Sequence, residues 1–342
     1  MQLKNLMQRL LIILGLIAIV YFFLTISIKD VQAAGRQVGT FVILLLGLTT
    51  FNIWIKSYRW QKMIFGISGK KIGTWFSFRS ILAGIAAGSF IPGRIEFAKT
   101  FLAKKEYDVP MSQSASALVI ERFMDFAAIL LILAGSIAFF HQENKDLLIA
   151  ASAMIIFLVI ITITLVFYPK VLMRPVNFIL RKMPGKDGPK DKLQRFSEDF
   201  FVSFKLLRSK WITVWFMFLS LAALVVEIVR LYSLFMILSI PAGISATSLV
   251  FTASVFIGIL STIPGGIGVT EISATTILSQ LIPGTPKEMI SSAILIERVI
   301  SYYLLVAIGS TILLYQPRSR TAAVVEKPQD ATDQELKEPI KS

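Results

Sequence analysis

Residues 263–271 read Ile-Pro-Gly-Gly-Ile-Gly-Val-Thr-Glu and interrupt a region that is otherwise apolar. Proline removes a backbone donor and glycine has a low helix propensity, so a regular helix should not continue here. Backbone groups freed inside a membrane must be buried in protein or line a watery cavity. The stretch therefore predicts a broken helix at Pro264, Gly265, Gly266 and Gly268, with the carboxylate of Glu271 beside it. Transporters build sites in this way.

An earlier segment has the same pattern. Residues 91–96 read Ile-Pro-Gly-Arg-Ile-Glu, again at the end of an apolar run. Pro92 and Gly93 are expected to break a helix, and the carboxylate of Glu96 follows closely. The first break therefore matches the second in residue types and in its neighbouring charge.

Two related heptapeptides follow the breaks. Residues 116–122 (SALVIER) and 292–298 (SAILIER) are identical at five of seven positions. The break proline precedes the glutamate of this motif by 29 residues in the first copy and by 33 in the second. Because the features occur in the same order at similar spacing, we expect an internal repeat over residues 38–140 and 211–315.

The composition is that of a membrane protein. Of the 342 residues, 55% are hydrophobic and 16% are charged, whereas soluble domains carry about 25% charged residues. Several apolar runs reach the roughly 20 residues that span a bilayer. Without cysteine, and with a single histidine, neither a disulfide nor a metal site is expected, and no cofactor is implied. The net charge of +14 is assigned to cytoplasmic loops, because no nucleic-acid-binding motif is present.

These features predict an all-α polytopic integral membrane protein with six full spans and two re-entrant helical hairpins. The expected parts are an N-terminal helix at 1–37, a first repeat with its return span at 38–168 (hairpin about 72–110), a basic cytoplasmic linker at 169–210, a second repeat at 211–315 (hairpin about 244–282) and a disordered cytoplasmic tail at 316–342. The expected location is the cytoplasmic membrane of the cell, with both termini cytoplasmic.

Basic residues set this orientation. The second span is expected at about 38–55, and Lys56 and Arg59 are read as the start of a cytoplasmic loop. The basic segment 94–110, which includes Lys99, is placed on the same side. The first hairpin then enters from the cytoplasm and the second from outside, so the repeats are inverted about an axis in the membrane plane. Inverted repeats commonly meet at a midplane substrate site.

The linker 169–210 holds eleven Lys and Arg against four Asp and Glu. Its part from about 191 to 208 has apolar residues at helical spacing with basic flanks. We expect an amphipathic helix that binds the anionic inner leaflet. The alternative is a linker helix that packs on the spans.

Ionisable side chains inside a bilayer cost roughly 2.5–3.5 kcal/mol each on insertion scales, so those in the apolar segments are functional candidates. The candidates for binding a headgroup phosphate are Arg94, Arg122, Arg230 and Arg298. The candidates for binding an amine or carrying a proton are Glu96, Glu121, Asp125, Glu227, Glu271 and Glu297. Arginine suits phosphate because its planar fork makes paired hydrogen bonds. The alternative is that these residues form buried ion pairs that hold the hairpins against the spans.

Helix geometry constrains their partners. Glu121 and Asp125 are four residues apart and share a helix face, and Glu227 and Arg230 are three apart and can pair. The adjacent Glu and Arg of each heptapeptide diverge by about 100° around the helix. Each member of those two Glu-Arg sequences must therefore find its partner on another helix.

Residues 92–125 (PGRIEFAKTFLAKKEYDVPMSQSASALVIERFMD) and 263–278 (IPGGIGVTEISATTIL) resemble the lysylphosphatidylglycerol synthase transmembrane region, also called the flippase-like domain. The resemblance covers residues 10–315 and implies movement of a charged lipid headgroup, such as that of an aminoacylated phosphatidylglycerol, between leaflets. Bifunctional members add a soluble C-terminal domain that transfers an amino acid from tRNA to the lipid. Here the chain ends about 27 residues after its last expected span, so lipid synthesis is not expected.

The sequence thus favours a flippase-like lipid transporter whose partner is a membrane phospholipid or another anionic or aminoacylated lipid. No G-x-x-x-x-G-K-[ST] motif occurs, so transport is expected to be passive or ion-coupled. Two alternatives are an ion-coupled small-solute transporter with the same core and a membrane scaffold or accessory subunit. An enzyme is not expected, because no nucleophile–base pair or metal cluster is recognisable.

Overall fold

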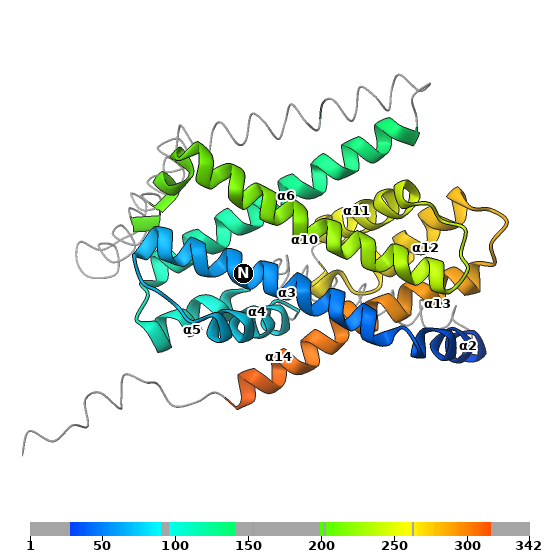
Figure 1. Cartoon of the computed structure of the whole chain (residues 1–342), viewed down its shortest axis with the longest axis horizontal. Coiled ribbons are helices and arrows are strands. Elements are labelled where there is room, and N and C mark those ends of the chain that lie inside the picture. The colour runs from blue at the N-terminus through cyan, green and yellow to red at the C-terminus, as the bar shows by residue number, and fades with distance from the viewer. Residues whose placement is uncertain are drawn as a thin grey trace, which may run out of the picture.

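The computed structural model describes residues 28–89, 96–140, 153, 199–200, 203–261 and 263–315. Its elements are helices throughout these residues (Figure 1). Residues 1–27 of the expected N-terminal helix, the return span after residue 140 except for residue 153, most of the linker 169–210 and the tail 316–342 lie outside the described residues. So do Pro92, Gly93 and Arg94 at the first expected break.

The described helices fall into two sets that follow each other in the chain. After α2 (Ile28–Gly39), the first half consists of α3 (Val42–Ser68), α4 (Thr74–Gly88), α5 (Phe97–Tyr107) and α6 (Met111–Phe140). A short 3-10 helix, η1 (Ser203–Arg208), leads to the second half, which consists of α10 (Lys210–Ile237), α11 (Ile244–Leu260), η2 (Pro264–Gly266), α12 (Val269–Leu281), α13 (Lys287–Arg298), η3 (Val299–Tyr303) and α14 (Leu304–Leu314).

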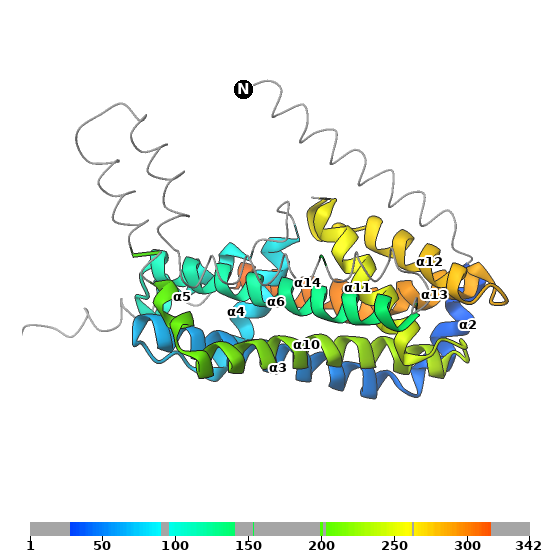
Figure 2. The same cartoon turned by 90° about the horizontal axis from the view of Figure 1, so that it is seen from above.

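The first helices of the two halves, α3 and α10, lie side by side and run in opposite directions (Figures 1 and 2). The sequence prediction that this span ends near residue 55 is wrong, since α3 continues as one helix to Ser68. Arg59, expected in a loop, is fully buried in it. Lys and Arg have high helix propensities, and carboxylates on other helices pair with Lys56 and Arg59, as described below.

Helices α4 and α11, which lie in the two predicted hairpins, pack across the two halves. α4 packs against its neighbour α5 and against α14, the last helix of the second half. In the same way, α11 packs against α12 and against α6, the last helix of the first half. At Gly309 of α14 the approach to α4 is so close that a Cβ would lie 2.1 Å from the carbonyl oxygen of Leu82. Each half therefore covers a helix of the other.

The second predicted break is confirmed at the backbone. Helix α11 ends at Leu260, Ile263 is extended, and Pro264 opens a single 3-10 turn before α12 begins at Val269. Gly265 has a φ of +66°, which glycine adopts without strain. A Cβ there would also lie 2.1 Å from the hydroxyl of Tyr302, so both conformation and space require glycine.

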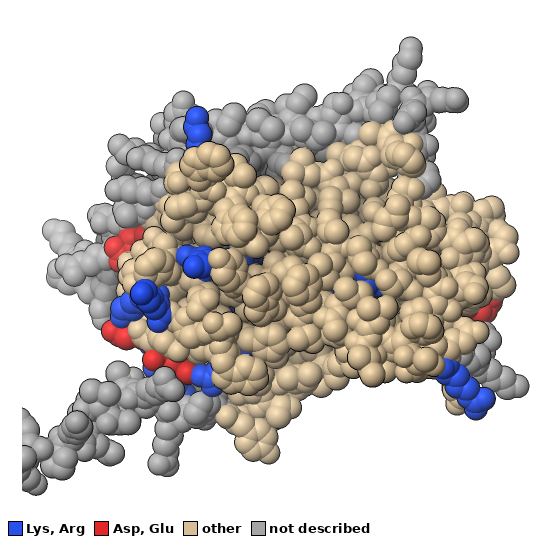
Figure 3. Space-filling model, in the orientation of Figure 1, with Lys and Arg blue, Asp and Glu red and all other residues tan. Residues whose placement is uncertain are grey.

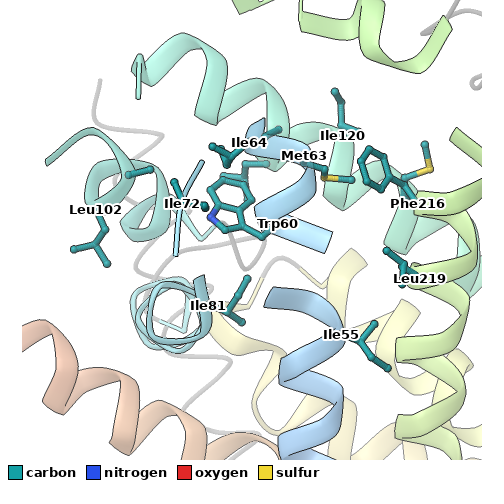
Figure 4. Close-up of a cluster of buried hydrophobic side chains, with 14 of the residues drawn as sticks. Ile55, Trp60, Met63, Ile64, Ile72, Ile81, Leu102, Ile120, Phe216 and Leu219 are labelled. Atoms are coloured by element: carbon teal, nitrogen blue, oxygen red, sulfur yellow. The ribbon is translucent and has the colours of Figure 1, made fainter. Parts of the chain in front are cut away.

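The largest apolar cluster lies where α3, α4, α5, α6 and α10 meet around the fully buried Trp60 (Figure 4). Phe204 and Leu207 of η1 are buried in the same cluster. For these residues of the linker the structure therefore agrees with the packed-linker alternative, in which the segment covers the helices.

The exposed surface has the character expected in a bilayer. In Figure 3 the middle of the visible face is almost without charged side chains, and most charges gather toward its two ends. The stretches Lys210–Ile237 and Lys287–Leu314 are long and apolar enough to cross a membrane. Trp211 at the start of α10 is 85% exposed, and Trp75 at the start of α4 is 74% exposed. Tryptophans at helix ends are typical of membrane–water interfaces.

Candidate functional site

A cavity of about 940 Å³ lies between the two halves, bounded by α3, α4, α6, α10, α11, α12 and α13. Most of its wall is apolar, but eight charged side chains line it. They are Lys56, Glu96, Arg122, Asp125, Glu227, Arg230, Glu297 and Arg298. Ligand pockets usually measure roughly 300–1,000 Å³, so this cavity has the size of a headgroup or a small solute.

Behind the cavity wall in the first half, the carboxylate of Glu121 is held by two cations from other helices. Nη2 of Arg59 on α3 lies 2.9 Å from Oε1, and Nζ of Lys99 on α5 lies 2.5 Å from Oε2. The guanidinium of Arg59 also donates to Asp125 at 3.1 Å, so the predicted shared face of Glu121 and Asp125 is used to bind one cation. Arg59, expected in a cytoplasmic loop, is fully buried in α3, and Lys99, expected in the basic segment that returns to the cytoplasm, is fully buried in α5.

The second ion pair of the first half borders the cavity. Arg122 on α6 forms an ion pair with Glu96, the carboxylate that follows the first predicted break. Nζ of Lys99 lies 3.0 Å from the same carboxylate, and Arg122 also approaches Asp125 to 3.8 Å. The side chain of Arg122 is 39% exposed. This arginine is therefore the most accessible of the charges in the first half's network.

The second half contains a corresponding pair of contacts, which are more deeply buried. Nη2 of Arg230 on α10 lies 2.8 Å from Oε1 of Glu297, and Nε of Arg298 lies 2.8 Å from Oε1 of Glu271. The backbone N–H of Gly268 donates to Oε2 of Glu271 at 2.7 Å. Glu271 thus caps the start of α12 and neutralises Arg298 at the same time.

The two halves follow the same scheme. The glutamate of each heptapeptide binds an arginine of that half's first helix, and the arginine of each heptapeptide binds the carboxylate that follows the break. The prediction that these Glu and Arg residues need partners on other helices is confirmed. The predicted pairing of Glu227 with Arg230 is wrong: Glu227 binds Lys56 at 2.6 Å, and Arg230 turns to Glu297. Partners on neighbouring helices replace the local i,i+3 contact.

The candidate residues predicted from the sequence differ in whether they line the cavity. Glu121 and Glu271 are 2% and 0% exposed and do not line the cavity, so their contacts position the groups that do. Among the described residues, Nη2 of Arg298 has no hydrogen-bond acceptor, although Arg298 lines the cavity and is only 8% exposed. A buried donor without an acceptor is unfavourable, and this nitrogen has almost no accessible surface, so a ligand oxygen could reach it only if the Arg298 side chain moved.

Sequence reasoning missed the cations that complete the network, namely Lys56, Arg59 and Lys99. A signal was present: the acidic residues of two apolar helices require cationic partners, and Lys56 and Arg59 directly follow one predicted span while Lys99 lies in the predicted first hairpin. It also missed Tyr302, which follows the second heptapeptide in a π-helical turn. Its hydroxyl donates to Oγ of Ser89 at 2.9 Å, and its ring lies 5.0 Å from the Arg298 guanidinium. Tyr302 thereby links the end of α4 to the second break.

Comparison with known proteins finds similar membrane proteins in other organisms. Similar chains include a UPF0104 membrane protein of Methanocaldococcus jannaschii, 27% identical over 80% of this chain and 84% of the relative. A second UPF0104 membrane protein, from Pyrococcus horikoshii, is 25% identical over 89% of this chain and 96% of the relative. The family model for the lysylphosphatidylglycerol synthase TM region matches residues 8–309. The chain therefore belongs to the lysylphosphatidylglycerol synthase TM region family of membrane proteins.

Proposed function

We propose that this protein moves a lipid with a charged headgroup between the leaflets of the cell membrane. The observation that carries the proposal is the cavity between the two halves, which combines a largely apolar wall with charges of both signs. Such charges are expensive at membrane depth, and they are typically retained where a polar group must pass. Membership of a family named for a lipid-modifying enzyme's membrane region points to the same class of substrate.

The headgroup would occupy the cavity while the acyl chains remain in the bilayer. Arg122, Arg230 and Arg298 are placed to receive the phosphate, since arginine forms paired hydrogen bonds with phosphate oxygens. Phe97 and Val119 line the cavity and are 51% and 41% exposed, which supplies an apolar rim along which the chains can pass. The cavity is too small for two long acyl chains as well as a headgroup, which favours a headgroup in the cavity and acyl chains in the bilayer.

The proposal includes six full spans, two re-entrant hairpins and two inverted repeats, with both termini cytoplasmic. Three observations support the inversion: the antiparallel α3 and α10, the packing of each hairpin arm on the other half's last helix, and the matched ion pairs. The halves differ in one respect. Arg122 is 39% exposed and its counterpart Arg298 is 9% exposed, so the arginine of the first half is the more accessible of the two. If Arg298 became the more exposed arginine and Arg122 the more buried one, the cavity would open to the other side of the membrane.

Cysteine labelling can test whether the two repeats are inverted, since the chain contains no cysteine of its own. Val119 and Leu295 occupy equivalent heptapeptide positions and are 41% and 9% exposed. In the variants V119C and L295C, a membrane-impermeant thiol reagent should label residue 119 rapidly from the cytoplasm and residue 295 slowly from outside. Labelling of both from the same side would show that the repeats are not inverted.

Lipid movement is tested with purified protein in vesicles that contain a phospholipid carrying a fluorophore on one acyl chain. Dithionite, which does not cross the membrane, bleaches only the outer leaflet. Protein-free vesicles should lose about half of the fluorescence, and vesicles with the protein should lose nearly all of it. If the bleached fraction stays near half with protein present, lipid translocation is excluded.

The same vesicles separate the two alternatives. A small-solute transporter would leave the lipid in place and accumulate a soluble substrate under an ion gradient. A scaffold would do neither and would tolerate replacement of the charges that line the cavity. Translocation that depends on those charges would exclude both alternatives.

A further inference from the structure

We propose that the cavity selects a zwitterionic headgroup, which carries one phosphate and one ammonium, over a headgroup with a net negative charge. This inference rests on the proposed function and adds the substrate class. It follows from the charge balance of the site and from the exposure of individual pairs.

The charges of the site are balanced among the residues that the structure describes. Four cations and four carboxylates line the cavity. Two further cations and two carboxylates lie directly behind them, namely Arg59, Lys99, Glu121 and Glu271. The sum is six positive and six negative groups, and each one has an opposite charge within 4.0 Å. Among the described residues, the site that receives the headgroup therefore has no spare charge of either sign.

A phosphate entering such a site must compete for a cation that is already paired. Arg122 is the most exposed of these cations, and it is shared by Glu96 and Asp125. A phosphate that takes the Arg122 guanidinium leaves those carboxylates with less positive charge in a poorly solvated wall, which is unfavourable. An ammonium on the same headgroup restores the balance, because it can bind Asp125, whose side chain is 24% exposed, or Glu96. A net-negative headgroup cannot do this.

The two ends of the headgroup have distinct positions in the cavity. Arg298 of the second half also lines the cavity, so its guanidinium can offer a second donor to a phosphate oxygen. Glu227 is 21% exposed and paired to the flexible Lys56, so it offers the ammonium another carboxylate. The site can thus exchange its internal ion pairs for ion pairs with a dipolar ligand while its net charge stays constant.

The experiment compares phosphatidylethanolamine with phosphatidylglycerol in the vesicle assay. Both carry the same fluorescent acyl chain, because a label on the ethanolamine nitrogen would remove its charge. The full-length protein should move phosphatidylethanolamine at least fivefold faster than phosphatidylglycerol. Equal rates, or faster phosphatidylglycerol, would overturn the inference while leaving lipid translocation intact. Movement of neither lipid would instead overturn the proposed function.

Charge variants provide the decisive control. E96Q removes one negative charge from the cavity, so the preference should shift toward phosphatidylglycerol by at least fivefold. If E96Q does not fold, D125N makes the same change at a more exposed carboxylate. The matched control is E106Q, since Glu106 pairs with Arg79 and does not line the cavity. E106Q should keep the wild-type preference, and an equal shift in E106Q and E96Q would contradict the charge-balance argument.

Discussion

Replacing Arg122 with glutamine should slow lipid movement by roughly tenfold to a hundredfold without unfolding the protein. Arg122 lines the cavity, is 39% exposed and pairs with Glu96. A hydrogen bond to a charged group is worth about 1.5–3 kcal/mol, and about 1.4 kcal/mol corresponds to a tenfold change in rate or affinity. Glu96 keeps Lys99 as a partner in the variant, so the wall should remain intact. The measurement is the rate of dithionite bleaching in proteoliposomes.

The matched control for this variant is R79Q. Arg79 also forms a partly buried ion pair, with Glu106, but neither residue lines the cavity. R79Q should therefore retain more than half of the wild-type rate. If R79Q and R122Q lose activity equally, the loss reflects the general removal of an ion pair, and Arg122 has no direct role in transport.

Replacing Gly309 with valine should prevent the two halves from packing together. A Cβ at this position would lie 2.1 Å from the carbonyl oxygen of Leu82 and 2.9 Å from Cβ of Ala86. The carbonyl oxygen belongs to the helix backbone of α4, so it cannot rotate away as a side chain could. Overpacking of this kind destabilises by about 1–3 kcal/mol or more. We expect the melting temperature in detergent to fall by roughly 10 °C or the protein to be lost as aggregate.

The control is the same substitution at Gly47 of α3, which is exposed and has no atom within 4 Å of an added Cβ. G47V should change the melting temperature by no more than roughly 2 °C, in line with other surface substitutions. Thermal unfolding followed by size-exclusion chromatography measures both variants. A G309V protein as stable as G47V would mean that α4 and α14 do not approach as closely as described.

The features that the sequence predicts correctly are those with local causes. The break at Pro264 follows from residues that cannot continue a helix, and α11, α12 and α10 lie close to their predicted positions. The extent of α3 could not be predicted in this way. Lys56 and Arg59 resemble the start of a basic loop until their carboxylate partners, which are more than sixty residues away in the chain, are known.

The same distinction holds for the site. The motif residues Glu297 and Arg298 stand out in the sequence because charge is rare in apolar segments, and both line the cavity. Their partners depend on how helices pack, which spacing along one helix does not reveal. Local spacing therefore predicted the wrong partner for Glu227, whose carboxylate reaches Lys56 on the antiparallel α3.

Each half packs one of its helices on the last helix of the other half, so the chain cannot be cut into two fragments that each keep all of these contacts. α4 packs on α14 and α11 packs on α6, so a fragment that ends after α6 would lack the helix that covers α4 at Leu82 and Ala86. Two different fragments, co-expressed from separate genes, could restore both contacts.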